Sequence, residues 1–300
     1  MTRSGDGEGA RQRSGEAGGR GWSGAVAETR SSLADALDAV ARAEGMTAAV
    51  CAMRVDGAPI VALRPDEPYY PASTIKVPIM VEVFRQAHAG RLSLADEAVL
   101  TPEDQVTGSG VLQHLSAGIR LPLRDLVTLM IIVSDNTATN MLIDRVGADA
   151  VNATMTALGL RGTVLYNKLQ VVPVERRGVN VTTAGDLCLL LGRIGRGEAV
   201  SYDASRRMVE ILLRQTLVGG LGRDLPTEAR GRAIGAPAPV RVASKSGTID
   251  GIRHDVGLVL LPERSYAVSV LLRDVDHADH GTDVISRLSR MVFDAVVGET

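Results

Sequence analysis

The chain has 300 residues, 45% of them hydrophobic, which is enough for one large domain or two interleaved ones around a sizeable core. Its formal net charge is −2 at pH 7, so the chain as a whole has no electrostatic reason to bind nucleic acid or an anionic membrane. Aromatic residues make up only 3%, which also disfavours stacking platforms for nucleic-acid bases.

The first thirty residues, 1–30, are rich in Gly, Arg and Ser and predict a disordered tail. A secretory signal would need an apolar run of about 7 to 15 residues, and this segment has none. No run of about 18 apolar residues, as a spanning helix needs, occurs in the sequence. The expected location is therefore the cytoplasm, with export still open if translation begins elsewhere than at Met1.

The remaining sequence shows helical and strand patterns in a definite order. Apolar residues at helical spacing over 33–40 predict an amphipathic helix that ends at Gly45. Two short apolar runs then flank Asp56–Gly57, a strong turn signal, and predict a β-hairpin. Residues 73–214 show mostly helical periodicity, strand character returns over 240–273, and a closing helix follows.

Strands therefore bracket a long helical block instead of alternating with helices. This order predicts an α/β protein of the α+β type, in which an antiparallel sheet carries the N- and C-terminal helices and an all-helical domain is inserted. We expect a discontinuous sheet domain made of residues 31–72 and 233–300, a helical domain over 73–232, and an active site between the two.

The basic residues show a strong preference that makes three of them stand out. Thirty of the 33 are arginine, and the three lysines are Lys76, Lys168 and Lys245. An ammonium can lose its proton when it is desolvated, whereas a guanidinium effectively cannot. Lys76 follows Ser73 by three positions, so a helix starting there would place the two side chains on one face. An amine with a lowered pKa can activate a hydroxyl nucleophile, although Ser-x-x-Lys alone also fits a solvated helix face.

A second polar stretch follows an apolar helical run. Ser134 could relay a proton, Asn136 could hold a substrate amide, and Asp135 would fix the local loop. The same three residue types also favour an ordinary helix cap.

A third stretch places Lys245 beside Ser246, Gly247 and Thr248 on an expected strand. A glycine inside a strand allows another backbone to approach closely, so Gly247 could admit a substrate. The alternative is a strand that simply ends in a turn.

Taken together, S-x-x-K, S-D-N and K-S-G resemble the S-x-x-K, S-D-N and K-T-G signatures of class A β-lactamases and penicillin-binding proteins. The motifs occur in the family's order, and the resemblance extends from about residue 31 to the end of the chain. Serine replaces threonine in the third motif, which conserves the hydroxyl group.

The resemblance implies a role for each matching residue. Ser73 would be the acylated nucleophile, Lys76 its proton acceptor, and Ser134 the relay to the leaving nitrogen. The backbone N–H groups of Ser73 and Thr248 would form the oxyanion hole. The implied partner is a small β-lactam or peptide-like substrate, bound by a monomer without metal or cofactor. The substrate-binding side chains and backbone would come from Asn136, Lys245, Ser246, Gly247 and Thr248.

One part of the family pattern is missing. Class A enzymes carry a loop glutamate, usually followed by Leu-Asn, which activates the water that releases the acyl group. Counting back without gaps from the end of the loop puts Asn167 near that position, and Glu175 is the only acid in the loop before Asp186. Lys168 lies in the same loop, where it could approach the site or remain a solvated charge.

We therefore predict acylation by β-lactams with slow deacylation. The alternatives are a D-alanyl-D-alanine peptidase, esterase or acyl-transfer enzyme, and a β-lactam-binding protein that is acylated once without turnover. A Ser-His-Asp hydrolase is not suggested, because no G-x-S-x-G motif occurs.

Overall fold

The computed structural model describes four stretches of the chain, residues 31–170, 178–217, 220–227 and 240–298. The predicted tail and Glu175 lie outside them. Among the described residues, no helix has the length and apolar character needed to cross a bilayer.

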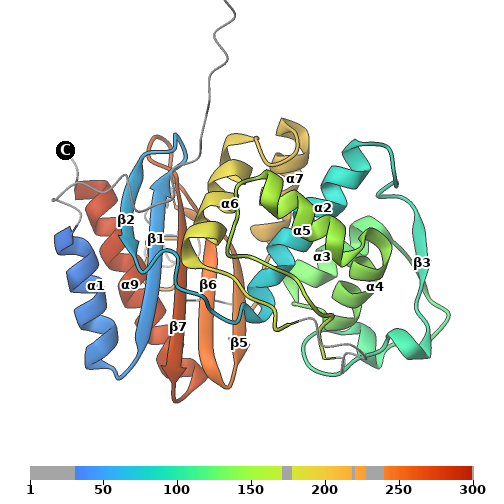
Figure 1. Cartoon of the computed structure of the whole chain (residues 1–300), viewed down its shortest axis with the longest axis horizontal. Coiled ribbons are helices and arrows are strands. Elements are labelled where there is room, and N and C mark those ends of the chain that lie inside the picture. Colours follow the sequence, from blue (N-terminus) through green and yellow to red (C-terminus); the bar gives the residue numbers. More distant parts are fainter. Residues whose placement is uncertain (1–30, 171–177, 218–219, 228–239, 299–300) are drawn as a thin grey trace, which may run out of the picture.

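Helices and strands follow one another largely as the sequence predicts (Figure 1). The α-helices are α1 (Ser31–Ala43), α2 (Lys76–His88), α3 (Leu123–Ile132), α4 (Asn136–Val146), α5 (Ala148–Ala157), α6 (Ala184–Arg196), α7 (Tyr202–Leu212) and α9 (Ala278–Gly298). The strands are β1 (Thr47–Arg54), β2 (Pro59–Leu63), β3 (Glu97–Val99), β4 (Arg120–Pro122), β5 (Arg241–Ile249), β6 (Gly251–Leu260) and β7 (Tyr266–Val275). A turn of 3-10 helix, η3 (Ala72–Ile75), leads directly into α2.

The main sheet has the strand order β2-β1-β7-β6-β5, and all of its neighbours run antiparallel. Its first two strands form the hairpin predicted around Asp56–Gly57, and the last three come from the predicted strand region. This arrangement confirms the predicted α+β class. It also leaves β5 at the sheet edge that faces the helices α2 to α5 (Figure 1).

Apolar side chains cover both faces of the sheet. On one face, Leu37 of α1 and Val284 of α9 pack with Val50 and Val270 of the sheet. On the other face, Cys51 of β1 and the side chains of α6 belong to a larger cluster that continues into the other helices. Each such fully buried apolar side chain contributes about 1.5–3 kcal/mol. The structure therefore places α6 on the sheet, although its residues fall in the predicted helical domain. The domain boundaries themselves stay a prediction.

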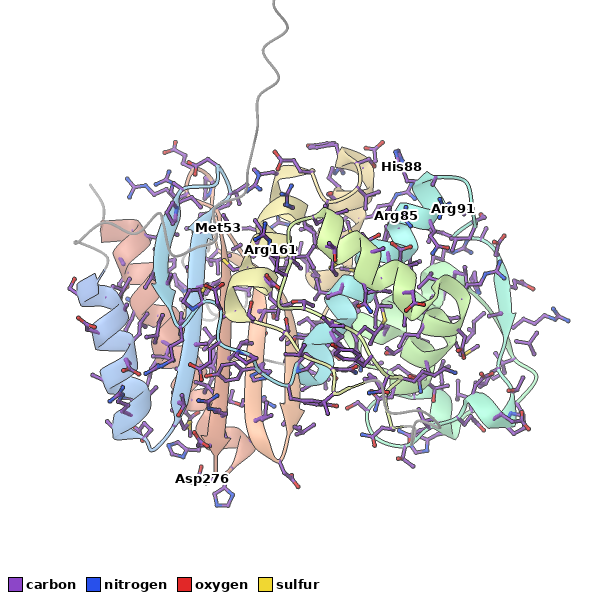
Figure 2. All side chains as sticks on the ribbon, viewed as in Figure 1. Met53, Arg85, His88, Arg91, Arg161 and Asp276 are labelled. Atoms are coloured by element: carbon purple, nitrogen blue, oxygen red, sulfur yellow. The ribbon has the colours of Figure 1, made fainter. Side chains whose placement is uncertain are left out.

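Helix α2 is buried along most of its length, which explains its apolar residues on every face. The acidic side chain of Glu82 is also buried in this helix, and a polar network satisfies its hydrogen bonds. Its carboxylate accepts hydrogen bonds from Arg85, Gln86 and Thr154 at 2.6–2.7 Å. Arg85 lies toward the end of α2 that is remote from the sheet (Figure 2). At the opposite end, η3 leads into α2 and contacts β5 and β6. Residues 70–75, which include Ser73, are called the nucleophile turn below.

Candidate active site

Ser73 lies in η3, immediately before α2. The preceding residue, Ala72, has φ = 46°, a left-handed conformation that residues other than glycine rarely adopt. The turn is closed by Thr74, whose backbone N and Oγ1 lie 3.0 and 2.7 Å from the carbonyl oxygen of Pro71. This sharp turn presents Ser73 at the N-terminal end of a helix, where unpaired N–H groups and the helix dipole favour developing negative charge.

The amine of Lys76 is the centre of the polar contacts. Its Nζ lies 3.1 Å from Ser73 Oγ and 2.9 Å from Ser134 Oγ. It also lies 2.7 Å from the carbonyl oxygen of Ser134 and 2.8 Å from Asn136 Oδ1. These last two oxygens can only accept hydrogen bonds. A neutral amine can satisfy both with its two hydrogens and keep its lone pair for a hydroxyl proton.

The surroundings of Lys76 favour that neutral form. Its side chain is fully buried, and burial is the main reason that its pKa is well below the usual value for lysine. The nearby charge of Lys245 lowers the pKa further, and Asp135 opposes both effects. Lys76 is thus better suited than an ordinary lysine to accept the proton of Ser73.

The Ser134-Asp135-Asn136 stretch joins α3 to α4. Ser134 also has a left-handed backbone, with φ = 55°, which turns its hydroxyl toward Lys76. Asp135 caps α4, and its Oδ2 accepts from the backbone N of Val111 and Leu112 at 2.6 and 2.9 Å. The expectation that Asp135 fixes the local loop agrees with these contacts.

On the sheet side, Lys245 is fully buried on β5. Its Nζ lies 2.7 Å from the carbonyl oxygen of Ser246 and 3.5 Å from Gln215 Oε1. Burial lowers the pKa of Lys245 to about 7, and the buried carboxylate of Asp255 limits the shift. This lysine therefore offers a positive charge below neutral pH.

Gly247 is where the sheet and the nucleophile turn meet. A Cβ atom at this position would lie 3.1 Å from both Ala72 Cβ and Ser73 N, and 3.2 Å from the carbonyl oxygen of Pro71. Any larger residue would crowd the turn, so glycine lets β5 approach it closely. The two amides implied for the oxyanion hole, those of Ser73 and Thr248, thus come from segments that touch at Gly247.

The structure brings together Ser73, Lys76, Ser134 and Asn136 through the Lys76 amine, and places β5 against the same turn. The side chains of the two loop candidates are bonded to other groups. The side-chain amide of Asn167 donates to the carbonyl oxygen of Gly178 at 2.7 Å. Lys168 Nζ lies 2.5 Å from Asp144 Oδ2, and the lysine side chain is 38% exposed. These contacts agree with the second alternative for Lys168, a solvated charge at the surface.

One residue of this loop is tied directly to α4, and the sequence count missed it. Both the N and the O of Leu169 are bonded to the side chain of Asn140 at 2.8 Å. Asn140 lies one helical turn after Asn136 on α4, so the two asparagines lie on the same face of that helix. Within the described part of this loop, residues 161–170 and 178–183, there is no carboxylate.

The sequence analysis also missed one hydrogen bond to the third motif and the residues that pair with that motif across the sheet. Gln215 Oε1 accepts from Ser246 N at 2.9 Å, and no local pattern points to a residue so far from the motif. The β5–β6 pairing places His254 opposite Gly247 and Arg253 opposite Thr248. A signal for this register exists in the two-residue turn Asp250–Gly251, which has the same sequence type as the recognised hairpin.

Comparison with known proteins agrees with this geometry. The model of the "Beta-lactamase enzyme family" matches residues 32–296. The chain belongs to this family. The solved structure of a β-lactamase from Sphaerobacter thermophilus DSM 20745 is 33% identical, with a TM-score of 0.81 over 90% of this chain and 98% of that one. A sequence search among curated proteins finds no match.

Two other solved structures cover both branches of the resemblance. A PBP-A variant, described as an acyl-enzyme complex with penicillin G, is 28% identical with a TM-score of 0.78 over 89% of this chain and 97% of that one. A variant of the class A β-lactamase of the last common ancestor of Gram-negative bacteria is 25% identical, with a TM-score of 0.75 over 89% and 100%. The chain is thus a serine β-lactamase-like hydrolase with the class A fold.

Proposed function

We propose that this β-lactamase-family protein is acylated on Ser73 by β-lactams and releases the acyl group slowly. The observation that carries the proposal is the position of the Lys76 amine, within 3.1 Å of the Ser73 hydroxyl and 2.9 Å of the Ser134 hydroxyl. One buried base can therefore take a proton from the nucleophile and return it through the second hydroxyl.

Acylation would proceed in two proton-balanced steps. Ser73 Oγ bonds to the lactam carbonyl carbon while its proton passes to Lys76 Nζ. The carbonyl oxygen becomes negative and is stabilised by the N–H groups of Ser73 and Thr248. Each such donor typically contributes about 2.7–4 kcal/mol, or 100 to 1000-fold in rate. The C–N bond of the ring then breaks, and the nitrogen takes the proton from Lys76 through Ser134.

The substrate carboxylate would bind at β5. Protonated Lys245 supplies the opposite charge, and the hydroxyls of Ser246 and Thr248 supply hydrogen bonds. Arg253, whose Nη1 donates to Thr248 Oγ1, adds a second positive charge at this end of the cleft. Within the described parts of the chain, Lys245 has no carboxylate within salt-bridge distance, and a buried ammonium of this kind gains from binding an anion.

Slow deacylation is supported by the residue that Asn140 binds in the loop. Leu169 is apolar and 8% exposed, so it cannot deprotonate a water molecule. The PBP-A variant, described as an acyl-enzyme complex with penicillin G, supports the acylation step in a similar protein. The lack of a carboxylate in the described loop also favours the alternatives, namely a peptidase, esterase or acyl-transfer enzyme, or a trap that is acylated once. Turnover of small esters with negligible turnover of penicillin would favour the first of these.

The proposal is tested by mass spectrometry after mixing the protein with penicillin G. We expect a mass increase of one penicillin per chain, located by peptide mapping to Ser73 and absent from Ser73→Ala. Ser93→Ala, which changes an exposed serine in another part of the chain, is the matched control and should be modified like the wild type. The absence of an adduct, or an adduct on another residue, would overturn the proposal.

A further inference from the structure

We propose that His254 is a positioning residue for the nucleophile, and that its Nε2–H holds the Ser73 turn against the sheet by a hydrogen bond to the carbonyl oxygen of Tyr70. The inference rests on the proposed acylation of Ser73 and assigns that step a residue outside the three motifs.

The contacts of the imidazole favour one of its two tautomers. His254 is fully buried on β6, and its Nε2 lies 2.9 Å from the carbonyl oxygen of Tyr70. Its Nδ1 lies 3.2 Å from the backbone N of Leu272 and 2.8 Å from the carbonyl oxygen of Arg253. A hydrogen on Nε2 satisfies two of these contacts, because Nε2 then donates to Tyr70 and Nδ1 accepts from the N–H of Leu272, whereas a hydrogen on Nδ1 satisfies only the carbonyl of Arg253. We therefore assign the hydrogen of the neutral ring to Nε2. Burial lowers the pKa of His254 to about 4, which keeps the ring neutral at ordinary pH.

The bonded carbonyl belongs to the nucleophile turn, three residues before Ser73. The cross-strand partner of His254 is Gly247, the residue that touches the same turn at Ala72 and Ser73. The sheet thus meets the turn at two adjacent points. Gly247 provides the space for close approach, and His254 provides the attachment.

The other side of this segment is anchored to the loop that precedes α6. Tyr69 and Thr182 exchange two backbone hydrogen bonds of 2.9 Å. The Tyr69 ring also meets the His254 ring edge-on, with 5.9 Å between centroids. The backbone bonds to Thr182 do not depend on His254, so Tyr69 stays in place if Nε2 no longer donates to Tyr70. The imidazole therefore positions only the residues between Tyr69 and Ser73.

This placement has a consequence for catalysis that a simple core histidine would not have. The oxyanion hole needs the amide of Ser73 on the turn and that of Thr248 on β5 at a fixed separation. Displacement of a reacting group by about 1 Å can cost on the order of 100-fold in rate. Loss of the Tyr70 bond should therefore slow the acylation step while substrate binding at Lys245 is retained.

The experiment compares the wild type with His254→Leu and His254→Gln. The acylation rate constant at saturating penicillin and the dissociation constant of the non-covalent complex are measured separately. We expect His254→Leu to lower the rate constant at least about tenfold while the dissociation constant changes by less than about threefold. Glutamine places an amide N–H near the position of Nε2, so His254→Gln should recover most of the rate.

Leu288→Ala serves as the stability control, because Leu288 is fully buried on the far face of the sheet. It should lower the melting temperature and leave the acylation rate constant unchanged. Three outcomes would overturn the inference: His254→Leu acylates at the wild-type rate, His254→Gln shows no recovery, or Leu288→Ala loses as much rate as His254→Leu.

Two further measurements test the inference, the first without any variant and the second without penicillin. Nitrogen-15 NMR of the wild type should show His254 protonated on Nε2, and a ring protonated on Nδ1 would contradict the proposal. A fluorophosphonate labels an activated serine by forming a P–O bond to Ser73 and releasing fluoride. If penicillin fails to acylate the wild type, the proposed function is wrong, and the rate of this labelling in the same variants decides the role of His254.

Discussion

The side chain of Asn140 holds Leu169 by both ends of its amide, with Nδ2 donating to the leucine carbonyl and Oδ1 accepting from its N–H at 2.8 Å each. The bonds involve only the backbone of residue 169, so they fix the loop while leaving the identity of its side chain free. Because α4 also carries Asn136, we expect this contact to determine which side chain of the loop stands next to the acyl group.

Leu169→Glu is predicted to increase deacylation. A glutamate at this position could deprotonate water, and general base catalysis typically contributes about 100 to 10,000-fold. We expect steady-state hydrolysis of penicillin to rise at least about tenfold, measured by the loss of lactam absorbance. Leu169→Gln, with the same shape and no base, is the matched control. A glutamate variant no faster than the glutamine variant would show that residue 169 does not face the acyl group.

Lys76→Arg is predicted to abolish acylation. A guanidinium remains protonated at any accessible pH and cannot accept the proton of Ser73. We expect the rate of adduct formation, followed by intact mass, to fall by about 100-fold or more. A rate within about threefold of the wild type would remove Lys76 from its assigned role as base.

The pH dependence of substrate binding should follow Lys245. Burial lowers the pKa of this lysine to about 7, so its charge is present below that value and is lost as the pH rises through it. Affinity for an anionic β-lactam should therefore be highest below pH 7 and decline above it. Lys245→Arg keeps its charge and should retain affinity toward pH 9. An identical decline in both proteins, measured at constant ionic strength, would assign the titration to another group.

His280 is predicted to stabilise the fold in a pH-dependent way. Its ring lies 2.8 Å from Asp276, which follows β7 (Figure 2), and 3.1 Å from Glu44 near the end of α1. The hydrogen bond with Asp276, followed by that with Glu44, raises the pKa of His280 above its ordinary value of 6.5. A raised pKa means that the stabilisation is complete below the unfolded-state value and is lost as the pH rises through the folded-state value.

His280→Ala should accordingly lower the melting temperature more at pH 5.5 than at pH 8.5. Thermal unfolding of both proteins at the two pH values measures the difference. An equal decrease at both would mean that the contacts of His280 stabilise the protein without its charge.

The sequence was informative wherever the pattern was local. Two short apolar runs around Asp56–Gly57 predicted the first hairpin. The three-residue spacing of Ser73 and Lys76 placed both side chains together because a helix begins there. The loop was harder, since a gapless count cannot reveal that Asn140 bonds to Leu169, or that Asp144 holds Lys168 at the surface.

The residues that hold the nucleophile turn against the sheet could not all be identified from the motifs. Gly247 belongs to a recognised motif, but the importance of His254 depends on strand register and on a contact with Tyr70, 184 positions away in the sequence. Such long-range contacts form only when the sheet is assembled. The sequence therefore identified the motif residues but not the residues that position them, such as His254.

The most direct test of the central claim is a pre-steady-state experiment with a chromogenic cephalosporin in excess over the protein. The proposed mechanism predicts a rapid burst of one opened lactam per chain, followed by a much slower steady rate, with Ser73→Ala showing neither. Linear turnover without a burst, or no opening at all, would contradict it.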